Sequence, residues 1–291
     1  MEKINRILAD ICTVREESGD YRDETGLLRC GKCGGYKERI VEVPENLRPG
    51  GKLRVKNLCP CEQEQEDRKD RERERRRFET HMDILRREGI TDPKYLKYTF
   101  GQDDGRNPKM TKTCLRYVEN WKEMRENNIG ILFYGGVGTG KTFFAAAIAN
   151  ELTKKLVSAG VTNFPWLLNS LQGRFQGDRQ EYIDRMRRYS LLVIDDLGAE
   201  RNTEFSAEMV YNVIDTRYRS GKPLIITTNL TLSDLEKPED LTYRRIYDRV
   251  LEMCPIRLKL NGESRRKENA EARTQLAREI LGRKECSGNT N

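Results

Sequence analysis

The chain has 291 residues, 35% of them charged, and a formal net charge of +7 at pH 7. No apolar run approaches the roughly 18 residues of a membrane span, and the N-terminus lacks the apolar core of a secretory signal, so we expect a cytoplasmic protein without a membrane partner. The only histidine, His81, argues against histidine-based catalysis or a histidine-rich metal site. Because disulfides are rare in the cytoplasm, the eight cysteines are expected to be thiols or metal ligands rather than disulfides. The excess of positive charge is a weak sign of nucleic-acid binding.

Two cysteine pairs near the N-terminus have the spacing of a metal site. Cys30 and Cys33 form a C-x2-C pair, and Cys59 and Cys61 form a C-x-C pair twenty-five residues further on. Each pair can hold a tetrahedral metal ion from a tight turn, and two such turns complete a four-cysteine site. We therefore predict that these four cysteines bind Zn²⁺. A redox pair or unligated thiols are the alternatives, and no βαβ pattern surrounds the first pair to favour redox chemistry.

The segment between the cysteine pairs is expected to form a small β-sheet. Residues 36–43 and 52–56 have the pattern of strands, and Pro49-Gly50-Gly51 lies between them as a turn. This arrangement predicts a zinc ribbon within an N-terminal domain of residues 1–61. So small a unit could hardly bury enough apolar surface by itself, so we expect its folding to depend on the metal.

Residues 62–91 are predicted to be a helical linker. The segment is dense in charge and has no apolar side chain before Phe78. Opposite charges recur four residues apart, as in Glu64 and Arg68, and such pairs stabilise an exposed helix. Because the signs alternate, the segment is not a purely basic arm.

A phosphate-binding loop follows a short apolar strand at residues 131–134. The loop matches the pattern G-x-x-x-x-G-K-[ST] and opens an Ala-rich segment, 143–152, that is predicted to be a helix. Glycines let backbone N–H groups close around phosphate oxygens, and the helix N-terminus adds the positive end of its dipole. Lys141 would contact the β- and γ-phosphates, and Thr142 would bind Mg²⁺. The predicted nucleotide-binding residues are Gly135, Gly136, Val137, Gly138, Thr139, Gly140, Lys141, Thr142 and Phe143.

Two further segments follow the P-loop helix. Residues 161–168 are predicted to be a second strand, which Pro165 would place at the edge of a sheet. Residues 171–188 are predicted to be largely helical and contain five arginines. These arginines are either a solvated face or a contact for DNA.

Polar side chains follow two buried strands. Residues 191–194 are apolar and lead into Asp195 and Asp196, as in a buried parallel strand that ends in acid. Asp195 would lie beside Mg²⁺, through water, and Asp196 would activate the attacking water as general base. Residues 224–229 form the next predicted strand, and Asn229 at its end would orient that water or touch the γ-phosphate.

The remaining predicted elements are three helices and one strand. Helices are predicted over residues 204–219 and 241–253, a final strand over 256–260, and a last helix from about 262 to 283. The glycine after the first of these helices, Gly221, is expected to end it.

The order of these motifs resembles the AAA+ family. Within that family it is similar to helicase loaders of the DnaC type and to IstB-type transposition helpers. The resemblance covers roughly residues 92–283, and it implies an ATPase domain over 92–291. The implied fold is α/β, with a five-stranded parallel sheet in the order 5-1-4-3-2 and ATP bound between subunits. The resemblance is carried by the P-loop, Ile194-Asp195-Asp196-Leu197-Gly198, Thr227-Thr228-Asn229, Tyr247-Asp248-Arg249-Val250 and Gly262-Glu263-Ser264-Arg265-Arg266.

The family's site residues map onto this sequence one by one. Lys141 and Thr142 match the Walker A pair, Asp195 and Asp196 match the Walker B pair, and Asn229 matches sensor 1. The second Walker B acid is usually glutamate in AAA+ proteins, so the shorter Asp196 leaves the rate of hydrolysis open.

Two arginines are implied by the resemblance alone. Arg249 resembles the arginine finger that reaches a neighbour's γ-phosphate, with Arg245 as a rival. Arg266 resembles sensor 2, with Arg265 as a rival.

The resemblance implies an ATP-dependent loader of the replicative DNA helicase. Such a loader binds single-stranded DNA, forms a homo-oligomer on ATP binding and grips the helicase through its N-terminal domain, here residues 1–61. A transposition helper of the IstB type is the main alternative. A small-molecule kinase and a zinc adaptor gated by nucleotide are two more, and Thr227-Thr228-Asn229 with the C-terminal arginines argues against the kinase.

Overall fold

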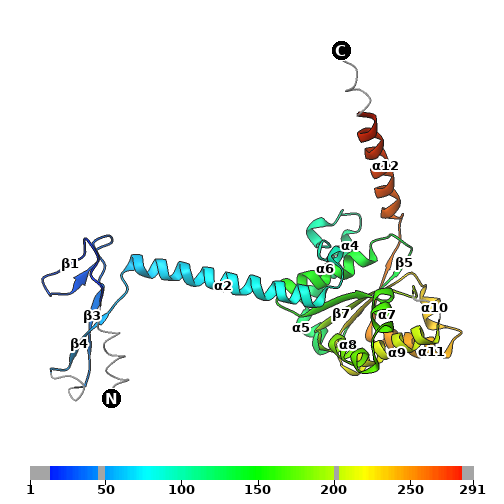
Figure 1. Cartoon of the computed structure of the whole chain (residues 1–291), viewed down its shortest axis with the longest axis horizontal. Coiled ribbons are helices and arrows are strands. Elements are labelled where there is room, and N and C mark those ends of the chain that lie inside the picture. Colours follow the sequence, from blue (N-terminus) through cyan, green and yellow to red (C-terminus); the bar gives the residue numbers. More distant parts are fainter. Residues whose placement is uncertain (1–13, 45–49, 200–202, 284–291) are drawn as a thin grey trace, which may run out of the picture. The chain divides into compact units, whose positions relative to one another are not determined.

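The computed structural model describes residues 14–44, 50–199 and 203–283 (Figure 1). The chain divides into two compact units, Met1–Thr80 and His81–Asn291. The division falls within helix α2, Pro60–Gly89, which takes in nearly all of the segment predicted as a helical linker. Within the described ranges, no helix combines the length and the apolar character needed to cross a membrane.

The first unit contains two small antiparallel sheets. Strand β1, Tyr21–Arg22, pairs with β2, Leu28–Arg29, and strand β3, Glu38–Glu42, pairs with β4, Lys52–Lys56. The second sheet is the one predicted from the sequence. The first sheet was not predicted, because two-residue strands leave no periodic pattern. Pro49 of the predicted turn lies outside the described residues, whereas Gly50 has the positive φ of +90° that favours glycine.

The second unit is built on a five-stranded parallel sheet in the order β6-β7-β8-β5-β9. Numbered from β5 along the chain, the same order reads 5-1-4-3-2 from the opposite edge. The predicted α/β fold and its strand order are therefore confirmed. The strands are β5 Ile131–Gly135, β6 Ala159–Asn163, β7 Leu191–Leu197, β8 Leu224–Thr228 and β9 Ile256–Leu260.

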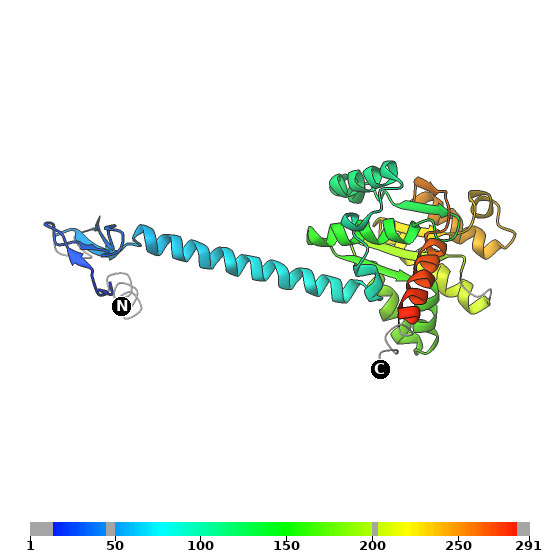
Figure 2. The ribbon, with the colours of Figure 1, turned by 90° about the horizontal axis from the view of Figure 1, so that it is seen from above.

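Helices cover both faces of the sheet (Figures 1 and 2). Side chains alternate along each strand, so Ile131 and Phe133 pack with α4 and α6, while Leu132 packs with α7, α9 and α11. Strands covered on both faces are buried along their whole length, as β8 is. The helices are α3 Pro93–Leu96, η1 Phe100–Gln102, α4 Pro108–Glu119, α5 Trp121–Glu126, α6 Lys141–Lys154, α7 Phe164–Gln172, α8 Gln176–Arg188, α9 Glu204–Arg219, α10 Leu232–Glu236, α11 Leu241–Met253 and α12 Arg265–Arg283.

The prediction of a strand over 161–168 is wrong in its second half. Strand β6 ends at Asn163, and α7 begins at Phe164 with Pro165 in its first turn. Asn163 Oδ1 accepts a hydrogen bond of 2.8 Å from the N–H of Trp166 and so caps the helix. Proline suits a first helical turn because its missing N–H has no partner there in any case. The edge position of β6 is nonetheless as predicted.

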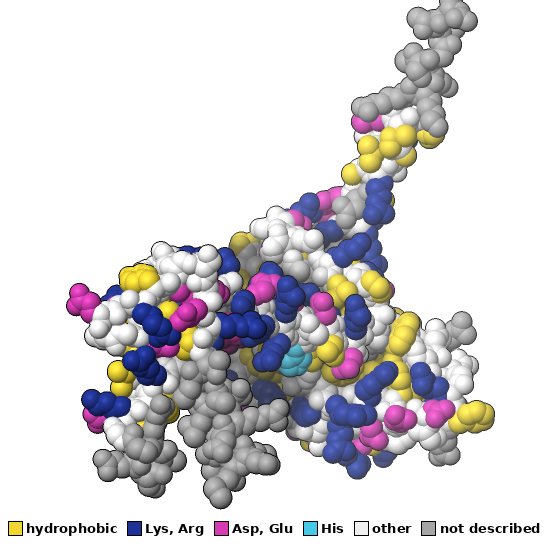
Figure 3. Space-filling model, turned by 60° about the vertical axis from the view of Figure 1, so that its left-hand side comes forward, with side chains coloured by type: hydrophobic (Ala, Val, Ile, Leu, Met, Phe, Trp, Pro, Cys, Tyr) yellow, Lys and Arg dark blue, Asp and Glu magenta, His cyan; other side chains and the backbone are white. Residues whose placement is uncertain are grey.

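Positive and negative side chains are mixed on one face of the molecule (Figure 3). On the face shown in Figure 3, Lys and Arg side chains are interspersed with Asp and Glu. The net charge of +7, which belongs to the whole chain, therefore does not by itself locate a basic surface.

Candidate nucleotide and metal sites

The P-loop connects β5 to α6 at the carboxyl edge of the sheet. Gly135 and Gly138 have φ values of +130° and +78°, which favour glycine. A Cβ on Gly135 would collide with the carbonyl oxygen of Leu260, and one on Gly138 would collide with Ser264. Glycine therefore lets the loop pass against the connection between β9 and α12, and this contact brings the C-terminal arginines to the phosphate-binding loop.

Lys141 lies at the floor of this loop. Its Nζ donates hydrogen bonds to the carbonyl oxygens of Gly135 and Gly136, at 2.9 and 2.7 Å, and to Oδ1 of Asn229 at 2.8 Å. The side chain is 5% exposed, and burial lowers its pKa. The structure thus brings together the P-loop lysine and the asparagine at the end of β8.

A cleft of about 350 Å³ opens over the loop. Its walls come from the P-loop, the ends of β7 and β8, the segment before α4 and the start of α12. The residues that line it are Tyr98, Val137, Gly138, Gly140, Lys141, Thr142, Phe143, Asp196, Ala199, Asn229, Arg265 and Arg266. A cleft of this kind, with a lysine, arginines and two polar strand ends, has the chemistry to hold a polyphosphate and a divalent cation.

Asp195 lies beside the P-loop threonine. It is 4% exposed and accepts hydrogen bonds from Thr142 Oγ1, at 2.8 Å, and from Thr227 Oγ1. Burial raises the pKa of the Asp195 carboxyl, and the hydroxyl of Thr227 acts in the opposite direction. The two residues predicted to hold Mg²⁺ are therefore in contact.

Asp196 leaves the regular strand. Its φ of +60° is left-handed, and the register between β7 and β8 shifts between Ile194 and Leu197. Such irregularities at a strand end redirect a side chain, and here Asp196 lines the cleft. Both acids of the predicted pair thus reach the site, one buried against Thr142 and one open to the cleft.

Sequence reasoning missed a buried tyrosine at this site. Tyr95 is 0% exposed, and its hydroxyl lies 3.5 Å from Oδ2 of Asp195 and accepts a hydrogen bond from Asn163 Nδ2 at 3.2 Å. Asn150 of α6 donates to the carbonyl oxygens of Tyr95 and Tyr98, both at 2.8 Å. The available signal was Asn150, a polar residue directly after the apolar run 143–149 of α6, because a buried amide needs such partners.

Both C-terminal arginine candidates reach the cleft. The backbone N–H of Arg265 donates to the carbonyl oxygen of Gly138 at 3.0 Å, and its guanidinium lies 3.1 Å from Asp104. Arg266 lines the same cleft. The predicted sensor 2 residue and its rival therefore share one site.

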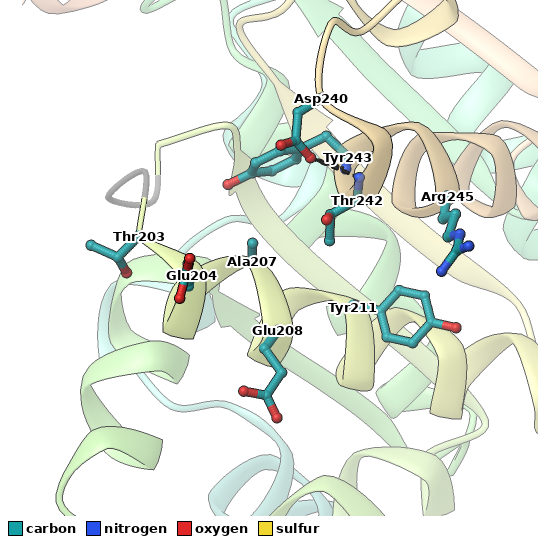
Figure 4. A pocket seen from close by; sticks show the side chains of 9 residues that line it. All are labelled: Thr203, Glu204, Ala207, Glu208, Tyr211, Asp240, Thr242, Tyr243 and Arg245. Atoms are coloured by element: carbon teal, nitrogen blue, oxygen red, sulfur yellow. Dashed lines mark hydrogen bonds between the residues drawn. The ribbon is translucent and has the colours of Figure 1, made fainter.

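The two arginine-finger candidates lie elsewhere in the chain. Arg249 is 2.9 Å from Asp215 Oδ1, and its guanidinium packs over the rings of Tyr211 and Tyr218, at 4.8 and 5.6 Å from their centroids. Arg245 is exposed and lines a separate cavity of about 600 Å³ between α9 and α11, where it extends toward Tyr211 (Figure 4). Among the described residues that line the nucleotide cleft, neither arginine is present.

The four N-terminal cysteines form one cluster. Their sulfur atoms all lie within 4.8 Å of one another, with Cys30 and Cys61 at 3.6 Å and Cys59 and Cys61 at 3.2 Å. Sulfur atoms on a tetrahedral zinc ion are about 3.8 Å apart, given Zn–S bonds of about 2.3 Å. Backbone N–H groups, that of Cys61 above all, lower the pKa of the Cys33 thiol to about 6. The donor set and its spacing fit Zn²⁺.

A buried charge network joins the two cysteine turns. Lys37 is 2% exposed, and its Nζ lies 2.7 Å from Asp20 and 3.4 Å from Glu62. Asp20 in turn accepts the N–H of Gly31, and Glu62 accepts the N–H of Cys59. The hydrogen bond from Lys37 lowers the pKa of Asp20 to about 2. One ammonium group thus connects the two halves of the cysteine cluster.

Comparison with known proteins places the chain in a family. Residues 61–272 match the model described as IstB-like ATP binding protein. Over 237 residues the chain is 29% identical to the phage-like element PBSX protein XkdC of Bacillus subtilis (strain 168), covering 78% of this chain and 79% of that protein. Over 186 residues it is 29% identical to the replicative helicase loader DnaI of the same organism, covering 59% of each.

A solved structure agrees with the sequence matches. The crystal structure of DnaI superposes with a TM-score of 0.50 at 25% identity, covering 60% of this chain and 96% of that chain. The family match spans well over half of the chain and includes the P-loop, both acids and Asn229. With the parallel sheet and the cleft described above, the chain belongs to the family of IstB-like ATP binding proteins.

Proposed function

We propose that this protein is an ATPase that loads a replicative DNA helicase onto single-stranded DNA. The observation that carries the proposal is the meeting of Lys141, Thr142, Asp195 and Asn229 at one cleft in a chain of an ATP-binding family. The loader role is supported by the similarity to DnaI, which is named as a replicative helicase loader.

Each residue of the cleft has a part in the proposed hydrolysis. Lys141 and the loop N–H groups would hold the β- and γ-phosphates, and Thr142 and Asp195 would hold Mg²⁺, which neutralises phosphate charge. The oxygen of a water molecule attacks the γ-phosphorus while the bond to the departing ADP oxygen breaks. Asp196 accepts the proton of that water, and Asn229 orients the water or contacts the γ-phosphate.

We predict that Asp196→Asn binds ATP but hardly hydrolyses it. Asparagine has the same size and tolerates the left-handed backbone at this position, but it cannot accept the proton. Loss of a general base is expected to lower the turnover by about 10²- to 10⁴-fold. Affinity for a fluorescent ATP analogue should stay within about threefold, since Mg²⁺ and phosphate contacts remain. Turnover at the wild-type rate would show that Asp196 is not the base.

We further propose that a neighbouring subunit supplies an arginine to each site. Both candidates lie on α11, and they differ in their contacts. Arg249 forms an ion pair with Asp215, whereas Arg245 is exposed. A subunit lacking the arginine has an intact cleft, and a subunit carrying Asp196→Asn has an intact α11. Mixing equal amounts of the two variants creates some subunit interfaces at which an intact cleft faces an intact α11.

We therefore predict that Arg249→Ala is nearly inactive alone and partly recovers ATP hydrolysis when mixed with Asp196→Asn. Arg245→Ala is tested in the same way, and the variant that is rescued identifies the residue. Arg244, the third arginine of α11, is exposed like Arg245, and Arg244→Ala is the matched control that should remain active alone. Absence of rescue in both mixtures would remove the proposed role of a neighbour's arginine.

Single-stranded DNA contact is proposed for the turn between α7 and α8. Phe175 is 86% exposed there, next to the exposed Arg174, and Arg185, Arg187 and Arg188 are exposed along α8. Aromatic side chains stack on unpaired bases, and arginines neutralise phosphates, which together support binding without sequence preference. We also propose that the N-terminal domain, residues 1–61, binds the helicase.

The experiment that tests the function uses the purified full-length chain. We expect it to hydrolyse ATP, to be stimulated by single-stranded DNA and to retain a hexameric replicative helicase in a pull-down with ATP. Because the matching family is named for IstB, a transposition helper is the second candidate. Stimulation by duplex DNA with retention of a transposase would favour that function, and no hydrolysis under either condition would exclude both ATPases.

A further inference from the structure

Thr227 places a hydroxyl in the buried interior of the sheet. It lies on β8, which is flanked by β7 and β5, and it is 0% exposed. The preceding residues of β8, Ile225 and Ile226, pack into the two apolar clusters that cover the sheet. A hydroxyl at such a place requires hydrogen-bond partners from the protein itself.

Both partners of Thr227 are acids of the cleft. Its Oγ1 donates to Oδ1 of Asp195 and accepts the backbone N–H of Asp196 at 3.0 Å. The directions are fixed by chemistry, because a carboxylate only accepts and an N–H only donates. A single hydroxyl therefore connects the side chain of one acid with the backbone of the next.

The hydrogen bond from the N–H of Asp196 to Thr227 lies where the regular pairing of β7 and β8 is interrupted. Pairs between β7 and β8 run in register up to Ile194 and Ile226 and then shift, so that Leu197 lies opposite Thr228. The hydroxyl of Thr228 donates to the carbonyl oxygen of Leu197 at 2.7 Å, where pairing resumes. At the shift, Thr227 supplies the acceptor for the N–H of Asp196, whose φ of +60° turns the residue out of the strand.

We propose that Thr227 is a positioning residue for ATP hydrolysis, an inference that rests on the function proposed above. Its donated bond holds the Asp195 carboxylate in the orientation needed for Mg²⁺. Its accepted bond holds the left-handed turn that directs Asp196 into the cleft. Without this hydroxyl, Asp195 keeps the bond from Thr142 at 2.8 Å and the distant tyrosine hydroxyl at 3.5 Å, while the N–H of Asp196 loses its acceptor.

The test compares Thr227→Val with Thr227→Ser. Valine keeps the shape and removes the hydroxyl, and serine keeps the hydroxyl and removes a methyl group. We expect valine to raise the Mg²⁺ concentration for half-maximal hydrolysis and to lower kcat, each by about 10- to 100-fold, as for other groups that orient metal ligands. Affinity for a fluorescent ATP analogue without Mg²⁺ should change by less than about twofold, and serine should recover kcat to within about fivefold of wild type.

A matched control separates the role of the hydroxyl from general damage to the core. Thr153 on α6 is also buried, at 1% exposure, and among the described residues its hydroxyl bonds only within its own helix, to the carbonyl oxygen of Ala149. Thr153→Val should therefore leave the Mg²⁺ dependence and kcat unchanged. If Thr227→Val does not fold, as judged by circular dichroism, Thr227→Cys keeps the size with a weaker donor and should show the same shifts in smaller measure.

The outcomes distinguish this inference from the proposed function. Wild-type protein that neither binds nor hydrolyses ATP would overturn the function itself. Active wild-type protein whose Thr227→Val variant keeps its kcat and its Mg²⁺ dependence would overturn the positioning role alone. A uniform loss of nucleotide affinity, with and without Mg²⁺, would also overturn it, because a merely structural effect predicts that pattern.

Discussion

Lys141→Ala is expected to abolish ATP binding at the concentrations at which wild-type protein is saturated. The ammonium group lies at the floor of the P-loop, where it would meet the β- and γ-phosphates. Each charge-assisted hydrogen bond contributes about 1.5–3 kcal/mol, so losing two of them lowers affinity by at least about 100-fold. Equilibrium titration with a fluorescent ATP analogue in the presence of Mg²⁺ measures the change.

The control for this prediction comes from the same helix. Lys154 of α6 has a side chain that is 44% exposed, and it pairs with Glu151 at 2.6 Å. Lys154→Ala removes the same charge from the same element and should leave affinity unchanged, since exposed pairs contribute little. Melting by circular dichroism shows whether Lys141→Ala is folded. A folded Lys141→Ala variant with wild-type affinity would mean that the nucleotide is not held by this loop.

Much of the second unit could be predicted from periodic patterns. Helices α9, Glu204–Arg219, and α11, Leu241–Met253, and strand β9, Ile256–Leu260, have the predicted bounds. Each helix has a capping side chain immediately before it, Thr203 and Asp240 respectively. Periodicity and caps are local, so a single sequence displays them.

The start of α7 shows where local patterns fail. Residues 161–168 are a short apolar run, and such a run fits a buried strand and a buried helix equally well. The decisive signal was Asn163 followed two residues later by Pro165, a cap and a proline that together begin a helix. The apolar run by itself predicts a strand that continues past Asn163, whereas the cap and the proline begin a helix there.

Contacts between distant segments account for the rest. Nothing near Arg249 in the sequence indicates that Asp215 and two tyrosines hold it, and nothing near Tyr95 indicates that its hydroxyl lies beside Asp195. The sequence motifs identify which residue types ATP hydrolysis would need. The fold decides which arginine is free and which hydroxyls surround the acid.

The second large effect is expected in the N-terminal unit. Cys59→Ser should eliminate the bound zinc, which we expect at one ion per chain in the wild type, and leave the first unit unfolded. Cys59 is 0% exposed, and among residues 14–44 and 50–80 the other buried apolar side chains are few, such as Leu28 and Val55. Structural zinc contributes about 10–16 kcal/mol at pH 7 in small domains, which this core cannot replace.

Three measurements test this prediction together. Native mass spectrometry should show wild-type protein one zinc ion heavier than the bare chain and Cys59→Ser at the bare mass. Limited proteolysis should degrade the first unit in the variant, whereas ATP affinity in the second unit should be unchanged because the cysteine cluster lies wholly within residues 30–61. Cys114 is a buried cysteine of the second unit, so the Cys114→Ala variant should still carry one zinc ion per chain. Folded wild-type protein at the bare mass would end the zinc assignment, and the Lys37 network would then have to hold the two cysteine turns by itself.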